Sequence, residues 1–316
     1  MLNILSITGP IYLSIGVGYV ATRRGFFSKV DGQVLGRFVL NFGLPAMLFN
    51  ALAQRQFSEI LHPSYLLAYG VGSLLALSSG FALWRWGRGK GRSESGLVAL
   101  GFSSSNTGYV GYPILLQILG PAAGVGLALS MLIENLLIIP LALGIADSGE
   151  VAHESWWRTV WASVKGMFKL PMIWAILAGF ACSLMGVHLP EALSKTVNLF
   201  AASCAAVALF ANGGSLVGMR FLGVLSEVSW VALGKLVLHP LSVGVMLWVV
   251  GPMTRELQIS AVVMAAMPML GIYPLLAQRH GHQPLCAAAL LVTTVMSFFT
   301  ISALLWGLNS LPGWQL

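Results

Sequence analysis

The side chains that could do chemistry in this sequence lie inside apolar segments. Residues 103–107 read Ser-Ser-Ser-Asn-Thr within the segment GFSSSNTGYVGYPILLQ. Hydroxyl groups in a helix usually bond back to the carbonyls of their own helix, so several of these serines are expected to do so. Asn106 carries both a donor and an acceptor, which its own helix cannot readily satisfy together. We therefore take Asn106 as the first candidate for contact with a ligand, with a purely structural role as the alternative.

Glu134 is the second candidate. Of the ten acidic residues, it alone falls near the centre of an apolar stretch, in SMLIENLLIIP. A carboxylate at membrane depth is costly and is by default a functional hypothesis. Burial in a low dielectric favours its protonated form, which would suit reversible proton binding. The alternative is a neutral Glu134 that is hydrogen-bonded to Asn135 or to a neighbouring helix.

The pattern of nucleophiles and metal ligands does not favour an enzyme. No Ser–His pair has a recognisable catalytic spacing, and no G-x-S-x-G motif occurs. Cys182, Cys204 and Cys286 lie far apart in apolar surroundings, without disulfide or metal spacing. His280 and His282 have no third ligand nearby and are expected in a solvated loop. We predict no catalytic residues, no cofactor and no metal.

Two Tyr-Pro pairs repeat each other half a chain apart, in GYPILLQ and IYPLLAQ. Proline inside a helix costs about 3 kcal/mol, and in hydrocarbon a broken helix survives only inside protein or beside water. An interrupted helix exposes N–H groups with partial positive charge, which can hold an anion. We predict two interrupted helices that meet at one site, with ordinary kinks as the alternative. Their residues are Thr107, Gly108, Gly111, Tyr112 and Pro113 in the first, and Pro268, Gly271, Tyr273 and Pro274 in the second.

The elements that must position these residues are membrane-spanning helices. Of the 316 residues, 57% are hydrophobic and 9% are charged, whereas about a quarter are charged in soluble proteins. A spanning helix needs ~20 apolar residues. We therefore predict an all-α integral membrane protein with ten transmembrane helices, whose first span is not a cleaved signal peptide. The predicted spans lie near 4–22, 34–54, 64–86, 97–118, 121–145, 170–188, 196–217, 229–250, 258–278 and 285–308.

The basic residues predict the orientation. With both termini outside, most of the 17 Lys and Arg residues fall in inner loops, and only Arg55, Lys195 and Arg255 lie outside. The orientation in the membrane thus accounts for the positions of the basic residues, and we assign them no role in ligand binding. Lys235 is placed two turns inside the inner end of span eight, within snorkelling reach, although a role facing a substrate stays open. His239 is expected to be packed and hydrogen-bonded.

The spans divide into two halves of opposite orientation. Each half contains five spans, and the Tyr-Pro pairs fall in the fourth span of each half. This arrangement indicates inverted repeats, as in many secondary transporters. We predict a first five-helix repeat at 1–146 and a second at 170–316. A cytoplasmic amphipathic linker at 147–169 would tether them, or alternatively would dock a partner.

Asn41 and Asn212 lie in spans two and seven, which are equivalent members of the two halves. Both could line the site, and hydrogen bonds between helices are an equal alternative. Asn212 precedes Gly213-Gly214, a pair that allows close approach of another helix.

Four motifs spread along the chain carry a resemblance to a known family. They are NFGLPAMLFNAL at 41–52, SSNTGYVGYPILLQILG at 104–120, ALFANGGSLVG at 208–218, and AAMPMLGIYPLLAQRHG with AAALLVTTVMSFFTI at 265–301. Through them nearly the whole chain resembles the auxin efflux carrier family, which includes plant auxin carriers and bacterial permeases. The resemblance implies two inverted five-helix repeats, with spans four and nine broken and crossing at prolines.

The resemblance also implies a ligand and its site. A small organic carboxylate, such as malate, malonate or an auxin-like acid, would bind beside the crossover, which residues 106–113 and 268–274 would form. Two departures from the family concern the substrate. The sixth span begins with Leu170-Pro171, where members often have Asn-Pro, and Met267 stands at the position that answers to Asn106.

Together these features predict a secondary transporter that moves a small organic anion by alternating access. An anion channel or an uncoupled uniporter is the alternative. Glu134 and Asn135 are the candidates for a coupling-ion site, with proton, sodium and no coupling all open. The expected partners are the anion and the lipid bilayer, a homodimer is open, and no nucleic acid is expected. The expected location is the cytoplasmic (inner) membrane, with both termini on the non-cytoplasmic side.

Overall fold

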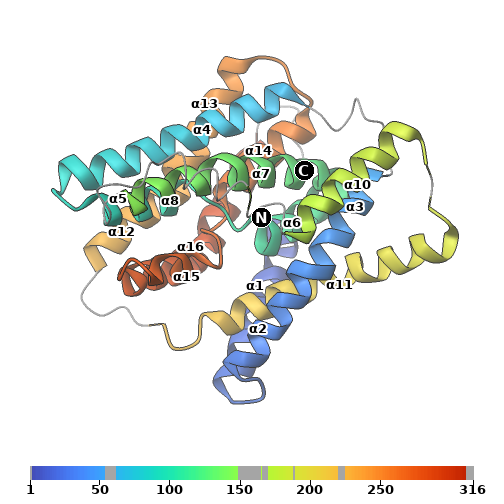
Figure 1. Cartoon of the computed structure of the whole chain (residues 1–316), viewed down its shortest axis with the longest axis horizontal. Coiled ribbons are helices and arrows are strands. Elements are labelled where there is room, and N and C mark those ends of the chain that lie inside the picture. Colours follow the sequence, from blue (N-terminus) through green and yellow to red (C-terminus); the bar gives the residue numbers. More distant parts are fainter. Residues whose placement is uncertain are drawn as a thin grey trace. The chain divides into compact units, whose positions relative to one another are not determined.

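The structure is a computed structural model that describes residues 2–53, 62–148, 165, 170–187, 189–219 and 225–310. These residues form α-, π- and 3₁₀-helices and no β-strand (Figure 1). The prediction of an all-α protein is therefore confirmed. Most of the predicted linker at 147–169 lies outside the described residues, and its role as a tether stays a prediction.

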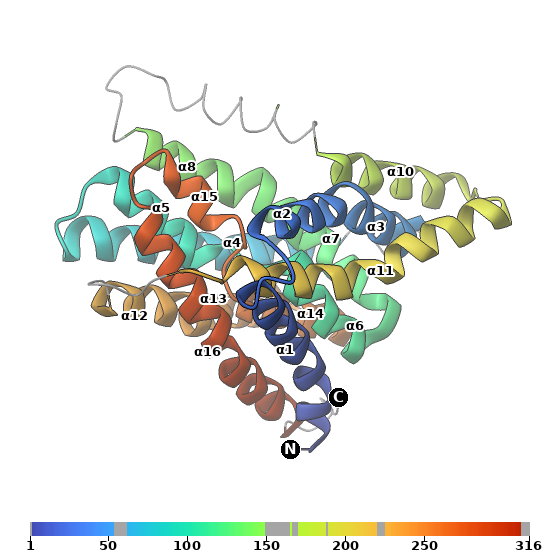
Figure 2. The same cartoon turned by 90° about the horizontal axis from the view of Figure 1, so that it is seen from below.

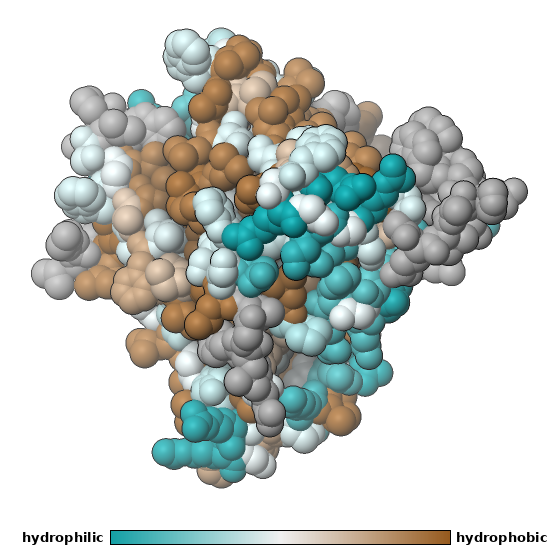
Figure 3. Space-filling model, turned by 90° about the vertical axis from the view of Figure 1, so that its left-hand side faces the viewer, coloured by the Kyte–Doolittle hydropathy of each residue, from teal (hydrophilic) through white to brown (hydrophobic). Residues whose placement is uncertain are grey.

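Many of the helices have the length and composition of membrane spans. Among the described residues, the stretches that meet both criteria are seven: Ile4–Arg23, Lys29–Ala53, Pro63–Gly87, Arg92–Asp147, Glu191–Ser215, Leu225–Val250 and Gln283–Ser310. They leave large apolar side chains exposed, for example Leu13 and Trp248, as contact with lipid requires. Figure 3 shows one face on which brown, apolar residues cover wide areas between teal, hydrophilic patches. Ten crossings and two inverted repeats stay predictions.

Contacts between residues divide the chain into two compact units, each drawn from both halves of the sequence. The first unit comprises Met1–Pro63, Thr107–Leu129 and Phe168–Val217. The second unit comprises Ser64–Asn106, Ser130–Met167 and Gly218–Leu316. The division passes along the chain between Asn106 and Thr107, inside the fourth predicted span.

The first unit contains two pairs of packed helices. Its elements are α1 (Leu2–Arg23), α2 (Lys29–Phe38), η1 (Val39–Gly43), α3 (Leu44–Ala53), η4 (Thr107–Gly111), α6 (Tyr112–Leu119), η5 (Gly120–Ala122), most of α7 (Ala123–Ile133), α10 (Pro171–Met185) and α11 (Glu191–Ser215). Helix α1 packs on α11, and α10 lies along α3 (Figures 1 and 2). A methyl group at Gly213 of α11 would overlap the carbonyl oxygen of Ile15 on α1. The predicted close approach at this glycine is therefore confirmed.

The second unit contains both interruptions, together with the helices that precede them. Its elements are α4 (Pro63–Ala82), η3 (Leu83–Gly87), α5 (Arg92–Ser103), η6 (Glu134–Ile138), α8 (Ile139–Asp147), α12 (Leu225–Leu233), η7 (Gly234–Leu238), α13 (His239–Val250), α14 (Arg255–Ala266), α15 (Tyr273–Gln278) and α16 (Gln283–Ser310). Helix α5 packs on α8 and α13 packs on α14, while α12 and α15 both pack on α16. The helices are interrupted at 104–106 and again at 267–272.

Several prolines are accommodated by π-helical turns rather than by breaks. The turns η1, η4, η6 and η7 each end two residues before a proline, namely Pro45, Pro113, Pro140 and Pro240. Proline lacks an N–H and its ring clashes with the carbonyl one turn earlier. A wider turn relieves the clash and moves the hydrogen bond, so that the Ile139 N–H donates to the Glu134 carbonyl five residues earlier. The helices therefore continue through these prolines.

Candidate functional site

The first interruption follows the serine run at the end of α5. Ser103 and Ser104 donate their hydroxyls to carbonyls one turn earlier in α5, both at 2.8 Å. The prediction that serines bond back to their own helix is confirmed for these two. After Ser104 the backbone is extended, and Asn106, which is 3% exposed, ends the interrupted segment.

The position predicted for the first interruption was wrong. The helix breaks at 104–106, and Pro113 lies at the start of α6, directly after the π-helical turn η4. The wider turn of η4 accommodates the missing N–H of Pro113, so the helix continues from η4 into α6. The predicted residues of this span are all buried in η4 and α6: Thr107, Gly108, Gly111, Tyr112 and Pro113. They belong to the first unit, whereas Asn106 belongs to the second.

The second interruption contains Pro268 and Gly271 and ends where α15 begins with Tyr273 and Pro274. The N–H of Asn106 donates to the carbonyl of Pro268 at 2.7 Å. One main-chain hydrogen bond therefore joins the two interrupted spans directly. Gly271 is exposed, whereas Pro268 is buried.

Tyr273 fastens α15 to α5. Its ring is fully buried, and its hydroxyl donates to the carbonyl of Leu97 at 2.9 Å. The hydroxyl passes over Gly101, where an added Cβ would lie 2.6 Å from the Tyr273 oxygen. The absence of a side chain at position 101 thus permits this contact. The bond fixes the beginning of α15 against the helix that carries the first interruption.

Glu134 lies against the first interruption. It is 4% exposed, and its Oε1 accepts hydrogen bonds from the Tyr69 hydroxyl at 2.9 Å and from the Ser105 N–H at 3.0 Å. The carboxyl group therefore supplies an acceptor to an extended segment that has no helical partner. Asn135 instead donates to the carbonyl of Met131 in its own helix at 2.8 Å. Of the two residues predicted to bind a coupling ion, Glu134 is therefore hydrogen-bonded to the interruption, whereas Asn135 is hydrogen-bonded to its own helix.

The side chain of Lys235 lies in the protein interior, so the expected snorkelling toward the membrane surface is wrong. The residue lies in η7, ten residues after α12 begins at Leu225, or about 15 Å along the helix. The side chain is fully buried, and Nζ contacts Ser105 Oγ, His239 Nδ1 and the Ala265 carbonyl, each at 2.7 Å. Snorkelling fails because the head group is too far from the helix end and finds three partners inside. The sequence signal was a lysine within an apolar stretch, five residues before Pro240.

His239 is buried and hydrogen-bonded, as predicted. Its Nε2 lies 2.9 Å from Ser73 Oγ on α4. His280, by contrast, was wrongly predicted to be solvated. Its side chain is buried, and Nε2 lies 3.3 Å from a carboxylate oxygen of Asp147. Among the residues that the structure describes, no group of three metal-ligating side chains comes together.

The two asparagines of the first unit have different surroundings. Asn41 is exposed and donates to the carbonyl of Arg37 in its own helix at 2.8 Å. Asn212 is buried, and its Nδ2 has no hydrogen-bond partner within the described part of the chain. An unsatisfied buried amide is uncommon and needs an explanation, such as a ligand or water. Asn212 is therefore the stronger candidate of the pair.

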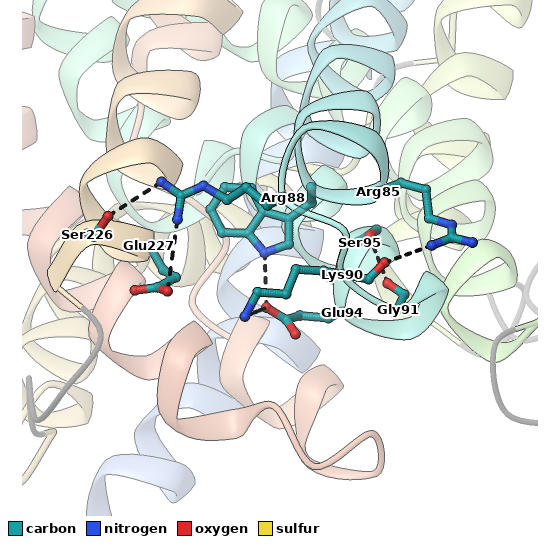
Figure 4. A network of polar contacts seen from close by, with 9 residues as sticks. Arg85, Arg88, Lys90, Gly91, Glu94, Ser95, Ser226 and Glu227 are labelled. Atoms are coloured by element: carbon teal, nitrogen blue, oxygen red, sulfur yellow. Dashed lines mark hydrogen bonds and ion pairs between the residues drawn. The ribbon is translucent and has the colours of Figure 1, made fainter.

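A second polar cluster of the second unit lies near the surface, where α4 turns into α5 (Figure 4). Glu94 accepts from the indole N–H of Trp84 at 3.0 Å and lies 3.5 Å from Lys90 Nζ. Arg88 lies 3.9 Å from Glu227 on α12 and 5.1 Å above the ring of Trp84. These charges fasten the loop to α12 and remain partly open to water.

Comparison with known proteins gives a match along nearly the whole chain. The family profile described as "Membrane transport protein" matches residues 8–306. The "Uncharacterized transporter YfdV" of Escherichia coli (strain K12) is 26% identical over 301 residues, which cover 94% of each chain. The "Putative malonate transporter" of Rhizobium meliloti (strain 1021) is 24% identical over 316 residues, covering 98% of this chain and 97% of that protein. An "Uncharacterized transporter" of Methanothermobacter thermautotrophicus is 24% identical over 296 residues.

Proposed function

Because this chain belongs to the membrane transport protein family, the auxin efflux carrier family, we propose that it is a secondary transporter for a small organic anion. Malonate and related carboxylates are the proposed substrates, since one relative over nearly the full length bears the name of a malonate transporter. Transport would occur across the cytoplasmic membrane by alternating access, through ten spans in two inverted repeats.

The observation that carries the proposal is the hydrogen bond of 2.7 Å between the Asn106 N–H and the Pro268 carbonyl. It supports a crossover of two interrupted spans, the arrangement around which many secondary transporters build their site. Irregular backbone at membrane depth is tolerated only inside protein or beside an aqueous cavity. Because each interruption of a helix at this depth costs free energy, two of them in one protein favour a function that uses the exposed main-chain groups.

The chemistry at the first interruption suits an anion. Asn106 ends the extended segment, and a new helical segment begins directly after it at Thr107. The first N–H groups of a helix lack intrahelical acceptors and carry partial positive charge. We place the carboxylate beside Asn106 and these N–H groups. Contacts with Gly108, Gly111, Tyr112, Pro113, Gly271, Tyr273, Pro274, Asn41 and Asn212 stay predictions.

Counterflow in proteoliposomes tests the proposal. Vesicles with purified protein and internal unlabelled malonate should accumulate external radiolabelled malonate at a saturable rate, and other mono- and dicarboxylates should compete. Asn106→Ala should reduce the rate about tenfold or more, as expected for one lost hydrogen bond to a charged group. Ser79→Ala is the matched control, because Ser79 is exposed and bonds only its own helix, to the Leu75 carbonyl.

Each other outcome points elsewhere. Currents far above carrier turnover, without counterflow, would indicate an anion channel. Uptake by Asn106→Ala at the wild-type rate would remove Asn106 from the site. An absence of counterflow with every carboxylate tested would contradict the proposed substrate class.

A further inference from the structure

The most unusual charge in the second unit is the ammonium group of Lys235. It is fully buried and lies 2.7 Å from each of three groups, which are Ser105 Oγ, His239 Nδ1 and the Ala265 carbonyl oxygen. An isolated buried ammonium is very costly, so such a group persists only with partners that stabilise its charge. The three groups come from the first interruption, from α13 and from α14.

The hydrogen-bond network assigns the charge states. A charged lysine has three N–H donors and no acceptor, which matches three contacts. The Ala265 carbonyl can only accept, and His239 Nδ1 accepts when the ring is neutral. His239 Nε2 lies 2.9 Å from Ser73 Oγ, and a neutral ring protonated at Nε2 would donate to that hydroxyl. An ammonium at Lys235 beside a neutral His239 therefore satisfies all of these contacts.

The ammonium lies where two half-helices end. Ala265 belongs to the last turn of α14, which ends at Ala266, and its carbonyl has no helical donor. Ser105 follows α5, which ends at Ser103. The C-terminal end of a helix carries partial negative charge. Glu134 adds a carboxyl group on the other side of Ser105, where it accepts from the N–H. Lys235 thus supplies positive charge where the half-helices α5 and α14 end, just before the two interruptions.

In carriers with discontinuous spans, unwound carbonyls and half-helix C-terminal ends are the groups that bind a coupling Na⁺. We infer that the Lys235 ammonium is a tethered cation that takes the place of such an ion, so that this chain moves its anion without Na⁺. This inference rests on the proposed transport function. It makes Lys235 a positioning residue, which holds the two interruptions together without touching the substrate.

The inference predicts a cation site in a variant. Lys235→Ala leaves a cavity lined by Ser105 Oγ, the Ala265 carbonyl oxygen and His239 Nδ1, all of which can accept. Oxygen ligands of this kind suit a hard cation. Lys235→Met removes the same charge but fills the space with an apolar chain of similar length, so it should leave no room for an ion. The two variants therefore separate loss of charge from loss of a cation site.

Thermal unfolding of purified protein in NaCl and in choline chloride, at equal ionic strength and without substrate, tests this directly. The wild-type Tm should be the same in both salts. Lys235→Ala should unfold at a lower temperature in choline chloride, with Na⁺ or methylammonium restoring the Tm in a saturable manner. Lys235→Met should show no recovery. Equal responses of the two variants to Na⁺ would overturn the inference.

Transport gives the second readout. Wild-type counterflow should continue unchanged when choline replaces Na⁺, whereas Lys235→Ala should lose about tenfold in rate in choline, because three buried acceptors lose their donor, and recover with Na⁺. If neither variant folds, the wild-type measurement decides, and a requirement for Na⁺ would overturn the inference. A complete lack of counterflow would contradict the proposed function instead, and would leave the thermal test of the tethered cation intact.

Discussion

Two of the clusters of acidic and basic residues in the second unit differ chiefly in their access to water. In the surface cluster of Figure 4, Lys90 and Glu94 are separated by 3.5 Å, and their side chains are 39% and 15% exposed. In the buried cluster, Lys235 and Glu134 bond the same residue, Ser105, through its hydroxyl and its N–H. Exposed ion pairs contribute about 0–1 kcal/mol, whereas buried charges impose a large desolvation cost.

The two clusters stabilise different parts of the second unit. The surface charges fasten the turn between α4 and α5 to α12, and water can replace any partner that is lost. The buried charges bond main-chain groups beside the interruptions, namely the Ser105 N–H and the Ala265 carbonyl, which would be left unsatisfied if a partner were lost. Substitutions should therefore have large effects in the buried cluster and small effects at the surface.

The largest effect on stability is expected for Glu134→Leu. It removes the acceptor of the Tyr69 hydroxyl and of the Ser105 N–H, and should lower the free energy of unfolding by about 3 kcal/mol, as for other buried donors left unsatisfied. Thermal unfolding in detergent measures the change. Glu134→Gln retains an acceptor oxygen and is the matched control. An equal loss in both variants would show that charge, rather than hydrogen bonding, is what stabilises the interruption.

Glu134→Gln also tests the predicted role in proton coupling. If Glu134 exchanges a proton during transport, the glutamine variant should bind substrate but lose uphill uptake driven by a pH gradient. Uptake in proteoliposomes with and without the gradient gives the result. Full retention of concentrative, pH-dependent transport would exclude coupling through this residue.

The next effect concerns the hydrogen bond between the interruptions. Asn106→Pro removes both the side chain and the N–H that donates to Pro268, whereas Asn106→Ala removes only the side chain. The proline variant should be less stable than the alanine variant by about 1–3 kcal/mol, the cost of one unsatisfied buried group. Thermal unfolding of the two proteins provides the difference. Equal stabilities would mean that the Pro268 bond does not hold the crossover.

A smaller effect is expected at the contact of α15 with α5. Tyr273→Phe removes one hydrogen bond to the Leu97 carbonyl and should cost about 1 kcal/mol. Gly101→Ala places a methyl group 2.6 Å from the tyrosine oxygen and should displace it, at a cost of about 1–3 kcal/mol. In the Tyr273→Phe background the penalty of Gly101→Ala should shrink, because the phenol oxygen is gone. Additive penalties would refute the close contact.

The smallest effect is expected at the surface. Lys90→Ala should change the free energy of unfolding by at most about 0.5 kcal/mol, and added salt should reduce the change further. Thermal unfolding at low and high salt is the measurement. A loss as large as that of Glu134→Leu would remove the distinction between the two clusters.

The sequence predicted the helical class, the presence of interrupted spans and the place of Glu134 inside an apolar helix, because polar and helix-breaking residues in an apolar background have few alternatives. It placed the first interruption at Pro113 rather than at 104–106, since proline was weighted above the serine run and the π-helical turn η4 was not anticipated. The burial of the Lys235 side chain was missed because a lysine two turns from a predicted span end can usually extend its ammonium group to the membrane surface. Its partners, Ser105 and Ala265, are distant in sequence and become visible only in the fold.

The account depends on carboxylate binding at the first interruption, and ligand-dependent thermal unfolding tests this most directly. Wild-type protein, Asn106→Ala and the control Ser79→Ala would be heated with malonate and with other mono- and dicarboxylates. At least one carboxylate should raise the Tm of the wild type and of Ser79→Ala, and should leave that of Asn106→Ala unchanged. An equal rise in Asn106→Ala would contradict the account.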